Sequence, residues 1–262
     1  MTPTDPRAPS VATFRFYAEL NDFLPPERHQ RSSAYAFLVA PSVKDAIESL
    51  GVPHVEVDLI LVNGRSVGFE HRLRAGDRVA VYPVFETLDV SPAVHLAGRP
   101  LREPRFVADV HLRRLARLLR LLGFDVAYSN DADDPDLVRT SLAKRRILLT
   151  RDRMLLKHGA LTHGAWIRST DPIEQAREVV RRFDLRSSAR PFTRCSSCNG
   201  PLVDVEKRRV LDDIPPRTAR WLDEYVHCAA CGKLYWRGTH HERLQSLIDR
   251  ILEPEPPAQR DS

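Results

Sequence analysis

The part of the sequence that most constrains the fold alternates short apolar runs with helical patterns. Three strand-like runs, at 106–108, 125–128 and 146–149, are separated by two helical segments. The first helical segment, 112–122, places leucines on one face and arginines on the other, and Gly123 follows it as a stop signal. Strands and helices that alternate at this spacing predict a parallel sheet with right-handed crossovers. The expected fold class is therefore α/β.

Aspartates follow all three predicted strands. Asp109 comes directly after the first, Asp134 closes an acidic run after the second, and Asp152 follows the third. Because the carboxyl ends of parallel strands share one edge of a sheet, we expect these side chains to converge. Converging carboxylates repel one another unless a cation lies between them, and oxygen ligands suit Mg²⁺ or Mn²⁺. Asp131 and Asp133 in the acidic run are reserve candidates for the same site.

Two alternatives stay open for the aspartates. An aspartate after a strand often caps the next helix, and each of the three can be explained in that way. The segment LLRLLGFDV also resembles a phosphoacceptor receiver domain superficially. A receiver carries an acidic pair after its first strand, whereas Asp109 is followed by Val110 and His111. The third strand ends in Thr-Arg-Asp and lacks the later lysine of a receiver, so this alternative is the weaker one.

The cysteines give the second clear signal. All four lie in two Cys-x-x-Cys pairs, Cys195 with Cys198 and Cys228 with Cys231, and a glycine follows each pair within two residues. Two such knuckles roughly 30 residues apart predict a structural Cys₄ zinc ribbon. Disulfides and a redox pair are the alternatives. The chain shows no secretion signal, and neither pair opens a helix after a strand in a thioredoxin-like unit, so a structural Zn²⁺ is expected.

The N-terminal part of the chain predicts a β-grasp fold. Its order of strand, strand, helix, strand, strand is given by residues 11–20, 34–40, 41–51, 57–62 and 79–83. Ser42 is the expected N-cap of the helix. The region resembles the ubiquitin-like, sulfur-carrier type of β-grasp in the runs LILVNG and AGDRVAVYP. Carrier chemistry needs a free C-terminal Gly-Gly, which is missing here, so the expected role is docking, RNA guiding or purely structural.

The central stretch carries a resemblance to a known family. FVADVHLRRLARLLRLLGFD, the DDPDL turn and RILLTRDRMLL are similar to the Mut-seven C-terminal RNase domain, a branch of the PIN-like nuclease fold. The resemblance implies a metal-dependent ribonuclease with Asp109, Asp134 and Asp152 as its metal site, and with the hydroxyl of Thr150 helping to position that site. Family members often carry an N-terminal ubiquitin-like domain and a C-terminal pair of zinc knuckles, and both patterns occur here.

Three modules are therefore predicted. They are a ubiquitin-like β-grasp domain at 11–87, a PIN-like RNase domain at 104–187 and a zinc ribbon with a closing helix at 191–253, with a linker at 88–103. No apolar run is long enough to span a bilayer, and a cytoplasmic location is expected.

Charge points to a polyanionic partner, which the resemblance identifies as RNA. The net charge is +5, and the arginine-rich helix lies beside the predicted acidic site. Candidates for phosphate contact on that helix are Arg114, Arg117 and Arg120. The residues do not distinguish tRNA, rRNA and mRNA, and the β-grasp domain could bind another protein. A non-catalytic RNA-binding or ribosome-associated adaptor, and a toxin-like nuclease, are the rival functions.

Several residues of the C-terminal half carry further expectations. Asp171 fits the N-cap of a helix better than a fourth metal ligand, and Gln175 is expected on the exposed part of that helix. In the ribbon, Tyr235 and Trp236 are expected either to stack on RNA bases or to fill a small core. Trp221 is expected to pack within a helical run, and a helix at 242–251 is expected to close the module.

Overall fold

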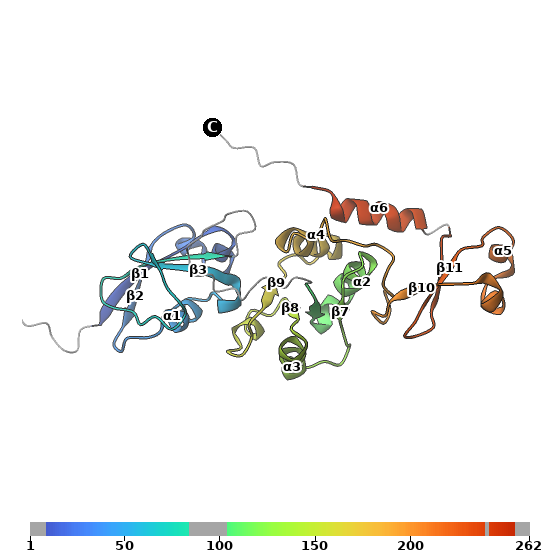
Figure 1. The fold of residues 1–262 in the computed structure, drawn as a ribbon. Helices are drawn as coiled ribbons and strands as arrows, with labels where there is room; N and C mark the ends of the chain where they lie inside the picture. Colours follow the sequence, from blue (N-terminus) through green and yellow to red (C-terminus); the bar gives the residue numbers. More distant parts are fainter. Residues whose placement is uncertain (1–8, 84–103, 239–240, 255–262) are drawn as a thin grey trace, which may run out of the picture. The chain divides into compact units, whose positions relative to one another are not determined.

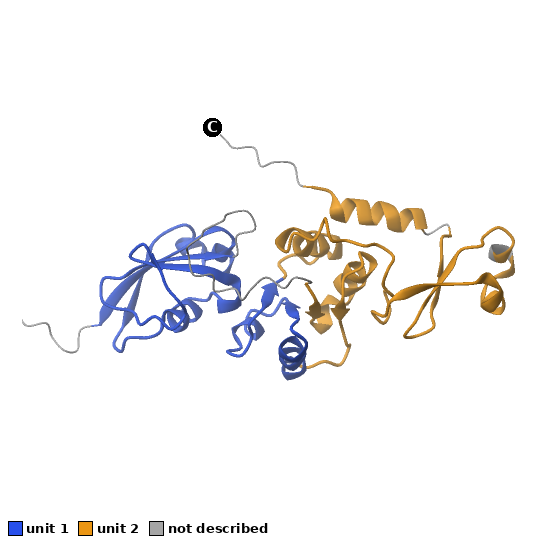
Figure 2. Cartoon of the chain, in the orientation of Figure 1, with its two compact units in different colours: residues 1–102, 134–166 blue, residues 103–133, 167–262 orange. Residues whose placement is uncertain are grey.

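The computed structural model describes residues 9–83, 104–238 and 241–254 (Figure 1). The predicted linker lies outside the described residues. The chain divides into two compact units, a first unit of residues 1–102 with 134–166 and a second unit of residues 103–133 with 167–262 (Figure 2). In the described ranges, no helix has both the length and the apolar character needed to cross a membrane.

The first unit begins with the predicted β-grasp. Its elements are β1 (Ser10–Phe16), β2 (Ser33–Phe37), α1 (Val43–Ser49), β3 (Val57–Val62), β4 (Arg65–Ser66) and β5 (Arg78–Pro83). The sheet order is β2-β1-β5-β3-β4, and β1 runs parallel to β5. Apolar side chains from the sheet and from α1, among them Phe14, Ile47 and Ile60, form a fully buried core. The order and the parallel central pair confirm the β-grasp prediction.

Local signals in this domain act mostly as the sequence indicates. The amide of Asp45 donates to the hydroxyl oxygen of Ser42 at 3.1 Å, which caps α1. The first strand, however, ends at Phe16 and not at Leu20, because Ala18–Phe23 form a 3-10 helix, η1. The side-chain amide of Asn21 donates to the carbonyl oxygen of Phe16 at 3.2 Å and fixes this turn.

The first unit also contains the second half of the central stretch. Its elements are α3 (Asp134–Lys144), β8 (Ile147–Thr150), η5 (Leu155–Lys157) and β9 (Gly164–Trp166). β8 and β9 are parallel, with Leu148 opposite Gly164 and Thr150 opposite Trp166. All four residues of β8 are buried, which explains the apolar run at 147–149.

The second unit begins with the first half of the central stretch. It contains β6 (Phe106–Ala108), η4 (Val110–Leu112), α2 (Arg113–Leu121), β7 (Val126–Ala127) and α4 (Pro172–Arg182). β6 and β7 are parallel, and the strand order of the four-stranded sheet is β7-β6-β8-β9. The predicted α/β class with a parallel sheet is confirmed.

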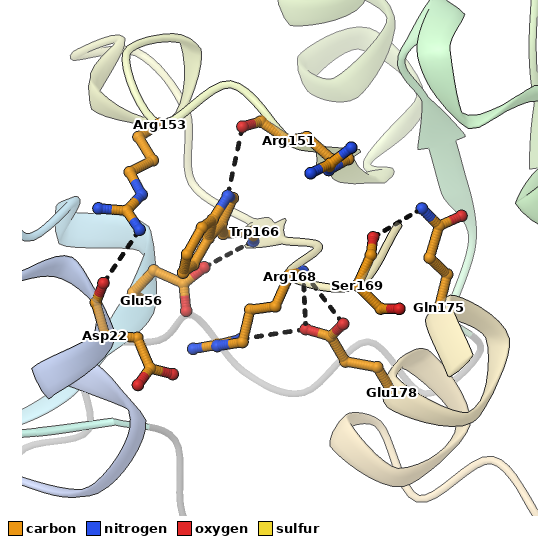
Figure 3. A network of polar contacts seen from close by, with 9 residues as sticks. All are labelled: Asp22, Glu56, Arg151, Arg153, Trp166, Arg168, Ser169, Gln175 and Glu178. Atoms are coloured by element: carbon orange, nitrogen blue, oxygen red, sulfur yellow. Dashed lines mark hydrogen bonds and ion pairs between the residues drawn. The ribbon is translucent and has the colours of Figure 1, made fainter. Parts of the chain in front are cut away.

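Of two polar residues at the start of α4, Asp171 has the predicted role and Gln175 does not. The carboxylate of Asp171 accepts hydrogen bonds from the amides of Ile173 and Glu174 at 2.9 and 3.1 Å, as the predicted N-cap should. The placement of Gln175 on an exposed face was wrong. Its side chain is buried, and its amide donates to the carbonyl oxygen of Ser169 at 2.8 Å (Figure 3). This partner lies outside the helix, where helical periodicity gives no information.

The end of α2 depends on a glycine. Gly123 has φ +95°, and its amide donates to Arg120 O at 2.9 Å while that of Phe124 donates to Leu119 O at 3.0 Å. These two bonds form a Schellman motif. The backbone of Arg190 approaches the same point, because its amide donates to Leu122 O at 2.9 Å. A β-carbon at residue 123 would run into the carbonyl group of Arg190.

Gly123→Ala is therefore expected to lower the free energy of unfolding by about 3 kcal/mol, from backbone strain and overpacking together. Gly76→Ala is the matched control, since Gly76 has φ +83° but open space around its α-carbon. The control should lose only about 1 kcal/mol from the left-handed conformation. Thermal and urea unfolding of both variants measure the difference. Equal losses would show that the approach of Arg190 has no energetic weight.

The rest of the second unit is a small antiparallel sheet and a helix. The sheet contains β10 (Leu202–Val205), β11 (Tyr225–Cys228) and β12 (Leu234–Trp236), in that order. The expected helical run around Trp221 is reduced to α5 (Pro216–Ala219), and the side chain of Trp221 is 60% exposed. The prediction that Trp221 packs was wrong, because β11 already begins at Tyr225 and shortens the segment.

The C-terminal helix does not close the ribbon in the way the sequence predicted. α6 (His241–Leu252) contacts α4, and Figure 1 shows one of its ends beside that helix. Ile248 and Ile251 are its buried residues, whereas Leu244 is exposed. The apolar stripe was recognised correctly, but its packing partner is a helix of the α/β part of the chain.

Candidate functional site

Asp109 lies directly after β6 and is buried, with 6% of its surface exposed. It is the N-cap residue of η4 by position, yet its side chain makes no capping hydrogen bond there. Its backbone carbonyl accepts the amide of Leu112 at 2.8 Å instead. Helix capping therefore does not account for the carboxylate of Asp109.

Tyr128 connects the end of β7 to the turn after β6. Its hydroxyl donates to Val110 O at 2.9 Å and also lies 3.0 Å from Asn130 Oδ1. The loop that carries Asp131 therefore begins beside the residue that follows Asp109. The sequence analysis missed this tyrosine. A hydroxyl-bearing aromatic at a strand end, just before an acidic run, is the signal that could have found it.

Asp134 is the first residue of α3 and is exposed. The N-terminal end of a helix carries partial positive charge, which stabilises a carboxylate at this position. Asp136, two residues later, is paired with Arg139 at 2.6 Å. Asp134 therefore lies where the sequence analysis placed it, at the start of the helix after the acidic run.

Thr150 and Asp152 come together at the end of β8. The side chain of Thr150 is fully buried, and the amide of Asp152 donates to its Oγ1 at 2.9 Å. Oδ1 of Asp152 accepts the amides of Met154 at 2.7 Å and of Leu155 at 3.4 Å. Asp152 thus shapes the turn from Thr150 to Leu155, which we call the Asp152 turn. Its convergence with Asp109, which belongs to the other unit, stays a prediction.

The arginines proposed for RNA contact differ in their surroundings. Arg114 and Arg117 are exposed on α2. Arg120 is 4% exposed; its Nε and Nη2 donate to Val126 O at 3.0 and 2.8 Å, and its Nη1 donates to Ser197 O at 2.9 Å. The assignment of Arg120 to the exposed, phosphate-binding face was wrong, because its guanidinium supports two backbone segments.

The four cysteines form a compact cluster. Their Sγ atoms all lie within 4.8 Å of one another, with Cys195 and Cys231 3.8 Å apart and Cys198 and Cys228 3.3 Å apart. A tetrahedral site with Zn–S bonds of about 2.3 Å puts its sulfur atoms about 3.8 Å from each other, whereas a disulfide needs about 2.05 Å. The thiols are free, and their geometry fits one metal ion and no disulfide. Within the described residues of either unit taken by itself, no other group of three or more His, Cys, Asp or Glu side chains is close enough to share an ion.

Hydrogen-bond donors surround the sulfur atoms. The amides of Cys198 and Gly200 donate to Cys195 Sγ and Cys198 Sγ, each at 3.4 Å, and the hydroxyl of Tyr235 lies 3.0 Å from Cys195 Sγ. Burial raises the pKa of the Cys195 thiol, but the bonds from Tyr235 and from nearby backbone amides outweigh it and lower the pKa to about 6. Tyr235 therefore supports a sulfur atom, a role that neither of its two expected functions described.

Comparison with known families shows to which family the chain belongs. The model of the Mut7-C RNAse domain matches residues 104–248, more than half of the chain, and the model of the Mut7-C ubiquitin domain matches residues 9–89. The chain belongs to the Mut7-C RNAse domain family. No curated protein and no solved structure matches it. The predicted resemblance is confirmed, and the match includes the cysteine cluster.

In this Mut7-C chain the first cysteine knuckle is attached to the α/β part. The amide of Val126 donates to Asn199 Oδ1 at 3.0 Å, and the side-chain amide of Asn199 donates to Asp125 Oδ1 at 2.7 Å. Burial lowers the pKa of Arg120, while the thiols of Cys198 and Cys195 and the carboxylate of Asp125 act in the opposite direction. The buried guanidinium of Arg120 is therefore placed to offset negative charge on these sulfur atoms and on Asp125.

Proposed function

We propose that this chain is a metal-dependent ribonuclease that hydrolyses RNA phosphodiester bonds. The match of residues 104–248 to the Mut7-C RNAse domain carries the proposal. Asp109, Asp134 and Asp152 are the proposed ligands of Mg²⁺ or Mn²⁺, and Asp131 and Asp133 stay in reserve. Three carboxylates form the oxygen-donor set that these hard cations prefer.

The proposed roles follow from the surroundings of each side chain. Asp109, buried at the end of β6, is protected from water, so its carboxylate gains from a nearby cation. Thr150 fixes the backbone of Asp152 through the 2.9 Å bond to its amide. When bound, a divalent cation stabilises the negative charge that develops on the phosphodiester and acidifies the attacking water. Arg114 and Arg117, exposed on α2, are the proposed phosphate contacts.

The cysteine cluster has a structural role in this proposal. Cys195, Cys198, Cys228 and Cys231 hold Zn²⁺ with all four positions filled, so no position is left for RNA or water. Trp236, partly exposed at the end of β12, offers a ring on which an unpaired base can stack. The proposed substrate is therefore single-stranded RNA or a loop, with its phosphates along α2.

Incubation of the purified chain with total RNA and Mn²⁺, followed by mapping of the cut ends, tests the proposal. We expect cleavage that depends on the added metal and stops in excess chelator. A titration with Mn²⁺ should show binding that is lost in Asp109→Asn. If RNA binds with equal strength to both proteins and stays intact, the chain is a non-catalytic RNA-binding adaptor and its aspartates are structural.

A further inference from the structure

The ubiquitin-like domain covers the strand that follows the Asp152 turn. η3 (His54–Glu56) lies against β9 and η5, and all three of its residues are buried. Glu56 has no exposed surface, and its Oε1 accepts the amide of Trp166 at 2.7 Å. β9 is the last strand in its sheet order. A buried carboxylate therefore satisfies a backbone donor that an edge strand would otherwise present to solvent.

Further contacts attach the segment between β8 and β9 to the ubiquitin-like domain. His54 Nε2 lies 2.9 Å from Leu161 O, and the ammonium group of Lys157 donates to Glu48 O at 2.9 Å. A β-carbon at Gly164 would lie 2.7 Å from a methyl group of Leu156 and 3.2 Å from one of Val55. The absence of a side chain at Gly164 therefore allows the close approach of the two segments.

Arg153, the residue after Asp152, contacts both β9 and the ubiquitin-like domain (Figure 3). Its guanidinium carbon lies 3.9 Å from the ring centre of Trp166 and 5.3 Å from that of Phe23. Nη2 of Arg153 donates to Asp22 O at 3.0 Å. Phe23 and Asp22 belong to η1 of the ubiquitin-like domain, so a cation–π contact and a charge-assisted hydrogen bond attach the Asp152 turn to that domain.

The residue before Asp152 is held as well. The indole nitrogen of Trp166 donates to Arg151 O at 3.3 Å, and Trp166 packs on the core of the ubiquitin-like domain. Both chain neighbours of Asp152 are thus attached to one aromatic side chain. The direction of a carboxylate depends on the backbone that carries it, so these contacts limit where Asp152 can point.

We propose that the ubiquitin-like domain is the support of the Asp152 turn and that Arg153 is the positioning residue through which it acts. The proposal rests on the proposed function, in which Asp152 is a metal ligand. Arg153 touches neither metal nor substrate in this role. Groups that orient a metal ligand typically change metal affinity or activity by about 10- to 100-fold when they are removed.

The full-length variant Arg153→Ala tests the proposal against Arg65→Ala. Arg65 is an exposed arginine on β4. Its substitution by alanine removes the same charge from the same unit. For Arg153→Ala we expect a Mn²⁺ affinity and a kcat about tenfold or more below wild type, with an unchanged KM for RNA. Hydrogen exchange at the amides of Met154 and Leu155, which bind Asp152, should be about tenfold faster. Arg65→Ala should match the wild type in Mn²⁺ affinity, kcat, KM and hydrogen exchange.

A conservative variant and a ligand variant separate the possible failures. Arg153→Lys keeps the charge but loses the planar group that stacks on Trp166, so it should recover only part of the affinity. If Asp152→Asn cleaves RNA like the wild type, the proposed function itself fails. If Asp152→Asn is inactive while Arg153→Ala keeps full kcat, full Mn²⁺ affinity and slow exchange, the support role alone is overturned.

Discussion

Asp152→Asn is expected to abolish RNA cleavage in Mn²⁺ while the chain stays folded. The substitution removes the negative charge that a divalent cation needs, and loss of such electrostatic stabilisation lowers rates by roughly 10²- to 10³-fold. The asparagine side chain keeps a carbonyl oxygen in place of Oδ1, which accepts the amide of Met154 at 2.7 Å. Single-turnover cleavage of an end-labelled RNA measures the first effect, and circular dichroism and thermal unfolding check the second.

Asp171→Asn is the matched control for this experiment. Asp171 also follows a strand, but its carboxylate caps α4 through two backbone amides. Asparagine is as good an N-cap as aspartate, so cleavage and stability should both stay at the wild-type level. Metal-independent cleavage by Asp152→Asn would contradict the acidic-site hypothesis. Loss of cleavage in Asp171→Asn with an unchanged fold would instead make Asp171 a fourth ligand.

Removal of Zn²⁺ is expected to unfold the cysteine-rich part of the chain. Structural zinc sites contribute about 10–16 kcal/mol of binding free energy, which matches or exceeds the 5–15 kcal/mol stability of a typical domain. Cys195 and Cys228 are buried, so their thiols would lose their common partner inside the protein. The bonds from Arg120 to Ser197 and from Val126 to Asn199 would weaken as well. We expect loss of the signal of Trp236, whose ring lies 6.4 Å from that of Tyr225, in near-ultraviolet circular dichroism, together with a lower Tm.

Restoration by metal separates this site from the acidic one. Zn²⁺ added back to the chelated protein should restore the spectrum and the Tm, whereas Mg²⁺ and Mn²⁺ should not, because thiolates select softer ions. The variant Cys228→Ser should resemble the chelated protein. A zinc-free chain with the wild-type Tm and spectrum would show that the cluster carries no folding energy.

Local patterns predicted the elements well. The apolar runs before Asp109 and Thr150 became strands, Gly123 ended α2, and Ser42 and Asp171 capped their helices. Each of these outcomes depends on residues within one turn of the signal, where propensity and hydrogen bonding are decided locally. The Cys-x-x-Cys pairs belong to the same class, because their spacing alone sets the knuckle geometry.

Sequence periodicity could not predict hydrogen bonds between polar groups that lie far apart in the sequence. Arg120 donates to a carbonyl 77 positions away, and Glu56 accepts an amide 110 positions away. A helical wheel places Arg120 on the polar face of its helix, and Glu56 lies between two predicted elements. Neither pattern contains information on which distant backbone group needs a partner. The convergence of Asp109, Asp134 and Asp152 is a prediction of the same long-range kind, and the metal titrations above are its test.

The first unit is discontinuous, and this has a practical consequence for deletion experiments. A chain shortened to begin at residue 104 would retain the whole span of the Mut7-C RNAse match. It would nevertheless leave Arg153 without Asp22, and Trp166 without both Phe23 and Glu56. Poor activity or aggregation of such a fragment would therefore reflect the loss of these contacts. Point substitutions give the cleaner test of what the N-terminal domain contributes.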